Sequence, residues 1–244
     1  MTTRTLESRV VEGRSVESGG SLVDQAVQAV RGHIRANDLK VGDTLPGEGR
    51  FAADLGVSRA VMREAFGALA ALRLIDVGNG RRPRVGAIDG SVIGTSLDHA
   101  VATSQISVAE VWDVRRTVEV RIAALAAEKR SDLQAEQILG LAESMARANG
   151  DMEKITAFDT AFHQIIAAAS GNFLFAQIVR SFEPQMELAV PRAWETRRTD
   201  DEKTSILAMH RHIAEAIADR DPVSAAAAMT AHFDASIGDL LAKG

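Results

Sequence analysis

The 244-residue sequence predicts a mainly α-helical protein with two domains. Residues 20–86 contain a helix, a glycine turn and a second helix, followed by two short strand-like segments. In residues 106–244 apolar residues recur with helical period and strand signals are absent, which predicts an antiparallel all-α helical bundle. Residues 87–105 mix Gly, Ser, Thr and small apolar residues, so we place the linker and the domain boundary there, with part of the range able to form a helix. Residues 1–19 alternate charges, and we expect them to form a flexible tail.

The N-terminal domain is predicted from its caps and turns. A first helix begins after Ser21, a good N-cap, in the segment SLVDQAVQAVRGHIRAN. The segment GEGRFAADLGVSRAVMREAFGALAALRLI then indicates helix, tight turn and helix, with Gly56 in the turn and Ser58 as the next N-cap. Two short strands are expected around 74–77 and 83–86, joined by a Gly-Asn-Gly turn.

The C-terminal bundle is predicted from a series of helical segments. The first, SVAEVWDVRRTVEVRIAALAAEK, begins with a capping box formed by Ser107 and Glu110. The last begins with Asp221 and Pro222, a suitable N-cap and first-turn pair. A bundle of about 140 residues buries close to two-thirds of its unfolded surface, which leaves an interior for a binding site. Further helices are expected at about 132–148, 151–169, 173–190, 200–219 and 222–242.

Composition excludes several classes of protein. There is no uncharged apolar run long enough for a transmembrane helix, and the N-terminus lacks the apolar region of a secretory signal, so we expect a cytoplasmic protein. The absence of cysteine excludes disulfides and thiolate metal sites. The net charge of −5 argues against a protein that coats nucleic acid. However, residues 58–84 carry six Arg against two acidic residues, which predicts a local phosphate-binding surface.

Basic residues are concentrated on the second helix of the helix-turn-helix and on the hairpin. Arg59 and Arg63 are four residues apart and lie off the apolar stripe of that helix. Guanidinium groups at a helix N-terminus suit phosphate contact and bidentate recognition of guanine edges. The basic hairpin is then a candidate wing that contacts the adjacent groove or backbone. The alternative is a solvated helix face, but the order of turn, cap and hairpin favours a DNA-binding winged helix-turn-helix.

The segment VGDTLPGEGRFAADLGVSRAVMREAFGALAALRLIDVGNGRRPRV resembles the winged helix-turn-helix of the GntR family of bacterial transcription regulators. The LP-x-E stretch, the VSR-x-x-x-RE core and the Leu-Ile strand entry carry the resemblance. There are two departures: Gly49 stands where family members commonly have Arg, and Arg82 and Pro83 replace the last residues of a Gly-Arg-Gly-Thr wing, so no operator sequence is implied. With Arg50 added as the residue beside Gly49, the implied DNA contacts are Ser58, Arg59, Arg63, Arg50, Asn79, Gly80 and Arg81.

The stretch FDTAFHQII places Asp159 and His163 four residues apart in an apolar helical segment, either as a buried polar pair or as half of a metal site. His210 and His232 share helical faces with apolar residues and should point inward, whereas His212 should point outward. For one histidine alone, a satisfied core position is the simpler interpretation. Three inward imidazoles and a carboxylate in one bundle instead predict a site for a divalent transition metal (Zn, Ni or Mn).

The spacing of these four residues resembles the ligand set of the FCD ligand-binding domain, found in the FadR-type branch of the GntR family. The resemblance extends over residues 21–242 and implies an effector pocket beside the metal. Arg115 interrupts an apolar helical face, so it either pairs with Glu119, four residues on, or binds a ligand carboxylate as the family pattern implies. Asn172 matches a position that often borders this pocket, although it also suits a helix cap.

These features together favour a transcription regulator, usually a repressor, that binds a palindromic double-stranded DNA operator as a homodimer. A small carboxylate would coordinate the metal, pair with Arg115 and change the placement of the DNA-binding domains through the linker. One alternative is a metal-dependent enzyme of the hydrolase type, using a metal-bound water. Another is a direct metal sensor, in which the metal itself is the signal.

Overall fold

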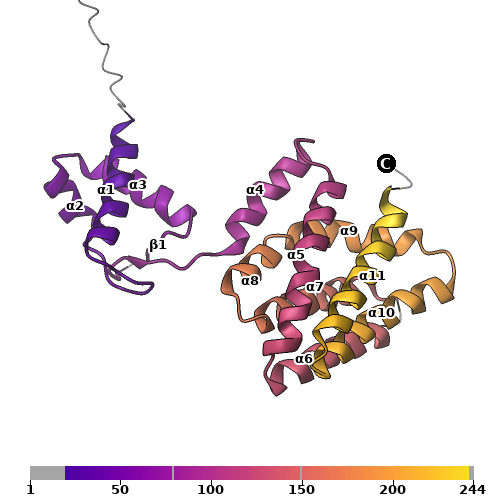
Figure 1. Ribbon diagram of the computed structural model, residues 1–244. Coiled ribbons are helices and arrows are strands. Elements are labelled where there is room, and N and C mark those ends of the chain that lie inside the picture. The colour runs from indigo at the N-terminus through magenta and orange to yellow at the C-terminus, as the bar shows by residue number, and fades with distance from the viewer. Residues whose placement is uncertain (1–19, 79, 149, 242–244) are drawn as a thin grey trace, which may run out of the picture. The chain divides into compact units, whose positions relative to one another are not determined.

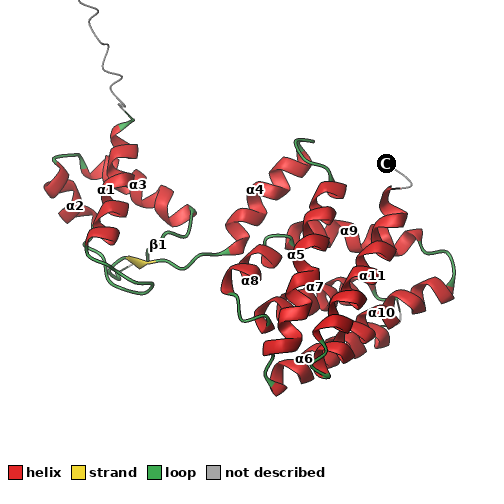
Figure 2. Ribbon diagram, viewed as in Figure 1, coloured by secondary structure: helices red, strands yellow, loops and turns green. Residues whose placement is uncertain are grey.

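The computed structural model describes residues 20–78, 80–148 and 150–241, and the chain divides into two compact units between Ala87 and Ile88. Helices dominate both units, and the one sheet described has two strands (Figure 2). The predicted tail, residues 1–19, and Asn79 lie outside the described residues. Among the helices described, none has the length and apolar character needed to cross a membrane.

The N-terminal unit has the predicted helix-turn-helix and hairpin. Ser21 caps the first helix, its Oγ accepting from the backbone N–H of Asp24 at 3.1 Å. Gly56 ends the second helix in the left-handed region, at φ 66°. Ser58 caps the third helix. All three signals were predicted from sequence and are confirmed. The elements are α1 (Leu22–Ala36), α2 (Glu48–Leu55), α3 (Arg59–Ala71), β1 (Ile75–Asp76) and β2 (Arg84–Val85).

The hairpin is anchored at its base to the body of the N-terminal unit. Strands β1 and β2 pair antiparallel, and Arg84 donates from Nη1 to the carbonyl oxygen of Gly42 at 2.8 Å. A Cβ on Gly86 would lie 2.2 Å from the carbonyl oxygen of Arg73, so only glycine fits where the hairpin leaves the unit. Arg84 is therefore engaged in holding the hairpin in place.

The C-terminal unit is a bundle in which α5 packs against α7, α10 and α11 (Figure 1). The predicted capping box is present, with the backbone N–H of Ser107 donating to Glu110 Oε2 at 2.7 Å. Asp221 caps the last helix through Oδ1, as predicted. The helices are α4 (Gly90–Ala102), α5 (Val108–Lys129), α6 (Asp132–Arg147), α7 (Met152–Ala169), α8 (Phe173–Arg180), α9 (Glu183–Thr196), α10 (Asp200–Ala218) and α11 (Pro222–Leu241).

The two units divide between Ala87 and Ile88, at the start of the predicted linker of residues 87–105, and α4 occupies most of the rest of this range and packs on α8 and α9. Two glycines of this range allow close packing. A Cβ on Gly90 would lie 2.2 Å from the carbonyl oxygen of Gln177, and one on Gly94 would lie 3.0 Å from that of Ser181. The backbone N–H of Gly90 also donates to Gln177 Oε1 at 2.9 Å. Small residues here let helix backbones approach one another.

The single helix predicted over 173–190 is also wrong, because the chain breaks it into α8 and α9 at Ser181 and Phe182. Pro184 lies in the first turn of α9. Proline has no N–H to donate to the preceding turn, so it is well suited to the first turn of a helix, where that N–H would have no partner. Ser181 ends α8 with its hydroxyl donating to the carbonyl oxygen of Ile178 at 2.6 Å.

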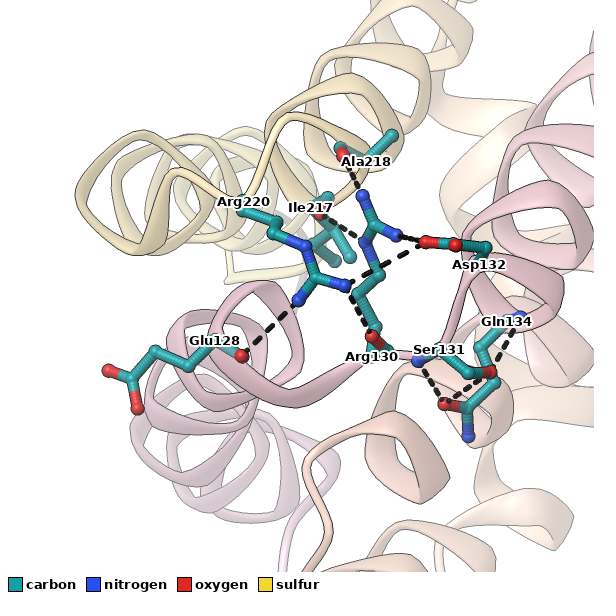
Figure 3. Close-up of polar contacts among 8 residues, drawn as sticks. All are labelled: Glu128, Arg130, Ser131, Asp132, Gln134, Ile217, Ala218 and Arg220. Carbon is teal, nitrogen blue, oxygen red and sulfur yellow. Dashed lines mark hydrogen bonds and ion pairs between the residues drawn. The ribbon is translucent and has the colours of Figure 1, made fainter.

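Two arginines join the loop after α5 to the loop after α10 (Figure 3). Arg130 donates to the carbonyl oxygens of Ile217 and Ala218, at the end of α10. Arg220 donates to the carbonyl oxygens of Glu128 and Arg130, at 3.4 and 3.2 Å. Carbonyls at a helix C-terminus lack intrahelical partners, so these side chains satisfy them and fix one corner of the bundle.

Candidate functional site

The exposed basic surface of the N-terminal unit begins at the start of α3. Ser58 Oγ accepts from the backbone N–H of Val61 at 3.2 Å, and Arg59 and Arg63 follow on the exposed side of the helix. Arg63 is 78% exposed, and its Nε lies 3.9 Å from Glu48 Oε2. An exposed pair at that distance is weak. The Arg63 guanidinium can therefore exchange this contact for a phosphate or a base edge.

The departure at Gly49 has a structural counterpart. A Cβ on Gly49 would lie 3.9 Å from Arg59 Nη2. The Arg59 guanidinium therefore lies beside α2, next to the position from which a side chain at residue 49 would extend. Arg50, the next residue, forms an exposed ion pair with Asp54, with Nε 2.9 Å from Oδ2.

The tip of the hairpin carries two exposed arginines, Arg81 and Arg82. Gly80 adopts a left-handed conformation, at φ 71°, and the backbone N–H of Arg81 donates to the carbonyl oxygen of Gly78 at 3.1 Å. The Arg81 guanidinium folds back over Gly78, since a Cβ there would lie 3.0 Å from its Nη2. The tip is therefore a tight turn that presents positive charge to solvent.

A cluster of three buried histidines lies inside the C-terminal unit. His163 from α7, His210 from α10 and His232 from α11 each offer a ring nitrogen within 4.8 Å of the others. The rings of His210 and His232 are nearest, with centroids 4.4 Å apart. His212 is exposed. The predicted inward and outward directions of these side chains are confirmed.

Asp159 joins the cluster from α7, one turn before His163. Its Oδ1 lies 2.8 Å from His210 Nε2 and 4.0 Å from His163 Nε2. Burial alone would raise the pKa of Asp159, but the hydrogen bond from His210 and the charges of the three histidines outweigh it and hold the pKa well below its ordinary value. Asp159 is therefore a carboxylate, and its Oδ2 is buried without a hydrogen-bond partner.

Glu119 on α5 orients His163. Its Oε2 contacts His163 Nδ1, and its Oε1 accepts from Arg115 Nε at 2.8 Å. Burial would raise the pKa of Glu119, but Arg115 and His163 outweigh it and lower the pKa below its ordinary value. A carboxylate at Nδ1 keeps the proton there and leaves the Nε2 lone pair for a metal, the usual arrangement around a metal-binding histidine. His163 Nε2 is buried and has no partner.

The other two histidines also fit a cation. His210 lies between two acceptors, with Nδ1 2.9 Å from the carbonyl oxygen of Ile206 and Nε2 2.8 Å from Asp159 Oδ1. A neutral imidazole has one N–H, so the Nε2 side needs a proton or a metal ion. Burial, with the charges of the other histidines, lowers the pKa of His232 well below its ordinary value, and its Nδ1 has no partner.

Three buried polar atoms without partners thus lie in one cluster: Asp159 Oδ2, His163 Nε2 and His232 Nδ1. Buried polar atoms in folded proteins nearly always have a partner, so each one calls for an explanation. A donor set of three imidazoles and one carboxylate suits a divalent transition metal such as Zn, Ni or Mn. The residues present fit such an ion.

A cavity adjoins the cluster and has about 40 Å³ open to the centre of a water molecule. Arg115, which is 1% exposed, lines it with its guanidinium among aromatic rings: Cζ lies 4.7 Å from the ring centroid of Trp112 and 5.3 Å from that of Phe233. The aromatic faces, together with the Glu119 carboxylate, stabilise the buried positive charge of Arg115. The cavity therefore brings a fixed positive charge next to the histidine cluster. Its other lining residues include Asp159, His210, His232, Met145, Ile155 and Leu207.

Of the two roles predicted for Asn172, effector contact and helix cap, the structure shows the cap. Asn172 is exposed and does not line the cavity; its Oδ1 accepts from the backbone N–H of Leu174 at 3.0 Å and so caps α8. Two residues of the site were missed. Glu119 was considered only as a partner of Arg115, although its position one turn later also faces α7. Trp112 was the second missed residue. It lies one turn before Arg115 on the same face of α5, and this spacing was the sequence signal that it shares the surroundings of Arg115.

Comparisons with known proteins agree with this organisation. Residues 22–85 match the family described as bacterial regulatory proteins, gntR family, and residues 110–235 match the FCD domain. The chain is similar to the HTH-type transcriptional regulator LutR of Bacillus subtilis, at 31% identity over 82% of this chain and 92% of that one. It is similar to the HTH-type transcriptional repressor NanR of Cronobacter sakazakii, at 26% identity over 91% and 86%.

Among solved structures, a GntR protein of Streptococcus agalactiae matches with a TM-score of 0.63 and 26% identity. The match covers 87% of this chain and 97% of that one. It spans both units, so the order of a helix-turn-helix followed by a helical domain is shared with a protein whose structure is known.

Proposed function

The chain belongs to the GntR family of bacterial transcription regulators, with an FCD domain after its DNA-binding domain, and we propose that it is a repressor controlled by a small carboxylate bound at a metal site. Its relatives are DNA-binding regulators and not enzymes, so the hydrolase alternative is set aside. Relatives that are named as repressors support repression, and not activation, as the role of this protein.

The observation that carries the proposal is the cluster of unpartnered ligand atoms beside the cavity. We propose that His163, His210, His232 and Asp159 hold one divalent ion (Zn, Ni or Mn). When bound, this ion supplies a Lewis-acid contact for a ligand oxygen. Arg115, whose guanidinium lines the same cavity, pairs with the rest of the carboxylate.

In this proposal, Glu119 is the residue that couples effector binding to the packing of the helices. It holds Arg115 and His163 together, one from α5 and one from α7. An effector carboxylate competes with Glu119 for the Arg115 guanidinium, and so changes how α5 packs. Regulation requires that the effector bind the free and DNA-bound arrangements with different affinity. Since α4 follows the N-terminal unit directly in the chain and packs on α8 and α9, we propose that α4, and not a flexible linker, carries the change.

At the DNA, two copies of α3 would enter successive major grooves of a palindromic operator, which makes a homodimer the expected assembly. Arg59 and Arg63 are exposed at the start of α3, where base edges are read. Ser58 is engaged as a cap and would contribute through the helix N-terminus. The proposed DNA-contacting residues are Ser58, Arg59, Arg63, Arg50, Asn79, Gly80 and Arg81.

The first test is metal content, measured by inductively coupled plasma mass spectrometry on wild type, His210→Ala and His212→Ala. We expect about one transition metal per chain in wild type and in His212→Ala, and loss of the metal in His210→Ala, because only His210 faces the cluster. His212→Ala is the matched control, two residues away on the exposed face. Absence of metal from wild type after incubation with Zn, Ni or Mn would refute the metal site.

The second test separates a carboxylate effector from a direct metal sensor. Operator binding is measured by gel shift with metal-loaded protein, with chelated protein, and with a panel of small carboxylates. Release of the operator by a carboxylate, with metal present throughout, supports the proposal. Release by chelation alone, with no response to any carboxylate, would make the metal the signal.

A further inference from the structure

We infer that Trp112 is a specificity-determining residue of the effector cavity: its indole N–H and the Arg115 guanidinium bind the same carboxylate, and the effector is a short monocarboxylic acid with an apolar tail. This inference rests on the proposed function and names the class of ligand that its cavity accepts.

Trp112 carries an unmet hydrogen-bond donor. The side chain is 4% exposed, and its Nε1 is buried with no hydrogen-bond partner. A buried indole N–H normally has a partner, and indole is a donor only. The missing group must therefore be an acceptor, such as a carboxylate, carbonyl or hydroxyl oxygen. Trp112 also lines the cavity, so a ligand can supply that acceptor.

The neighbouring charge indicates which acceptor. Arg115 follows Trp112 by three residues on α5, with its Cζ 4.7 Å from the indole centroid, so the two side chains share one wall. The guanidinium donates to a carboxylate through Nε, but its Nη1 contacts the sulfur of Met186, which is a weak acceptor. A ligand carboxylate at this wall gives the guanidinium an oxygen in place of sulfur and gives Nε1 its acceptor. Its remaining lone pairs can face the metal.

The size and lining of the cavity limit the rest of the ligand. A space of about 40 Å³ takes roughly three water-sized groups, which suits an acid of about two to four carbons. The polar side chains Arg197 and Ser236 also line the wall, and each donates to a backbone carbonyl, of Ala193 and His232. The remaining wall includes Met145, Ile155, Val190 and Leu207, whose apolar side chains suit an apolar tail on the ligand.

The two tryptophans of the chain allow a direct spectroscopic test. In a nitrogen-15 correlation spectrum of the zinc-loaded protein, two indole N–H signals are expected, and Trp112→Phe assigns them. Adding sodium propanoate should shift the Trp112 signal downfield, as a new hydrogen bond to an anion does. Trp194 also lines the cavity, so the assignment from Trp112→Phe decides which of the two signals moved. If calorimetry shows that wild type binds propanoate while the Trp112 signal stays in place, the inference is overturned.

Affinity gives the second test. Trp112→Phe keeps an aromatic face for Arg115 and removes only the donor, so propanoate should bind about tenfold more weakly with metal content unchanged. Hexanoate should bind wild type at least about tenfold more weakly than propanoate, because its tail exceeds the cavity. Equal propanoate affinity in Trp112→Phe would overturn the inference alone. Failure of zinc-loaded wild type to bind any carboxylate would overturn the proposed function as well. If Trp112→Phe does not fold, Trp194→Phe assigns the two indole signals instead, and the wild-type spectrum then decides.

Discussion

The two units use arginine in opposite ways. On the N-terminal unit Arg63 is 78% exposed, with its nearest acidic partner 3.9 Å away. In the C-terminal unit Arg115 is 1% exposed and donates to Glu119 at 2.8 Å. Water solvates the first charge, so removing it changes little in the fold and much in what the surface can bind. Protein groups solvate the second, so the fold and the site depend on it together.

This difference shows where a charge contributes to stability and where it contributes to recognition. Exposed ion pairs contribute little because water and salt screen them and two long side chains must be ordered. A buried pair need not stabilise the fold over an apolar pair, but breaking it leaves one charge without a partner in a medium that solvates it poorly. The buried charges of the C-terminal unit are therefore expected to be the positions most sensitive to substitution.

The sharpest comparison is between two adjacent residues of α5, Arg115 and Arg116. Arg115→Ala removes the main partner of buried Glu119 and opens space between aromatic rings, so it should lower the free energy of unfolding by roughly 3–5 kcal/mol. Arg116 forms a surface pair with Asp234, with Nε 2.7 Å from Oδ1, and Arg116→Ala should leave stability almost unchanged. Urea denaturation followed by circular dichroism measures both. Equal effects would show that burial does not separate the two arginines.

Much of the fold could be predicted from sequence because its signals are local. Capping residues such as Ser21, Ser58 and Ser107 act on backbone groups within three residues. The helical period of apolar residues can likewise be recognised within a single segment, from the residues on one of its faces. The errors concern long-range packing. Gly90 and Gly94 contributed to the linker prediction, although they permit contact with a segment more than 80 residues away. Nothing local distinguishes a glycine of that kind from one in a linker.

The candidate metal site was predictable for a similar reason. His163, His210 and His232 each reveal their direction by the face of their own helix, so a shared interior follows from three independent patterns. The roles of Glu119 and Trp112 depend on which helix packs against α5. That information is distributed over the whole bundle, so spacing along α5 shows that Trp112 shares a face with Arg115 but not what that face contacts.

The second prediction concerns α4 and its attachment to the C-terminal unit. Gly90→Ala would place a methyl group 2.2 Å from the carbonyl oxygen of Gln177, so α4 must move. We expect a loss of about 2–4 kcal/mol in the free energy of unfolding, in the range of overpacked or strained core positions. Gly140→Ala, on α6 with nothing within 4 Å of the added carbon, is the control. It should be neutral or stabilising by up to about 1 kcal/mol through helix propensity.

The same pair of variants tests how regulation is transmitted. If α4 carries the effector signal, Gly90→Ala should weaken the response of operator binding to carboxylate more than it weakens operator binding itself. Gly140→Ala should leave the response intact. A normal effector response in Gly90→Ala, with destabilisation confirmed by thermal melting, would exclude α4 packing as the route.

The smallest expected effect on the fold, and the clearest on recognition, is at Arg63. Arg63→Ala removes an exposed guanidinium whose partner Glu48 is 40% exposed, so both units should melt as in wild type. Binding to an operator obtained by in vitro selection should weaken by about 10- to 100-fold if Arg63 reads a base edge. The measurement is fluorescence anisotropy with operator and with random DNA at fixed salt. Equal losses on both would mean that Arg63 contacts phosphate only, because phosphate contacts carry no sequence information. A lower melting temperature of the N-terminal unit would contradict the contrast between Arg63 and Arg115, because an arginine solvated by water would then contribute to the stability of the fold.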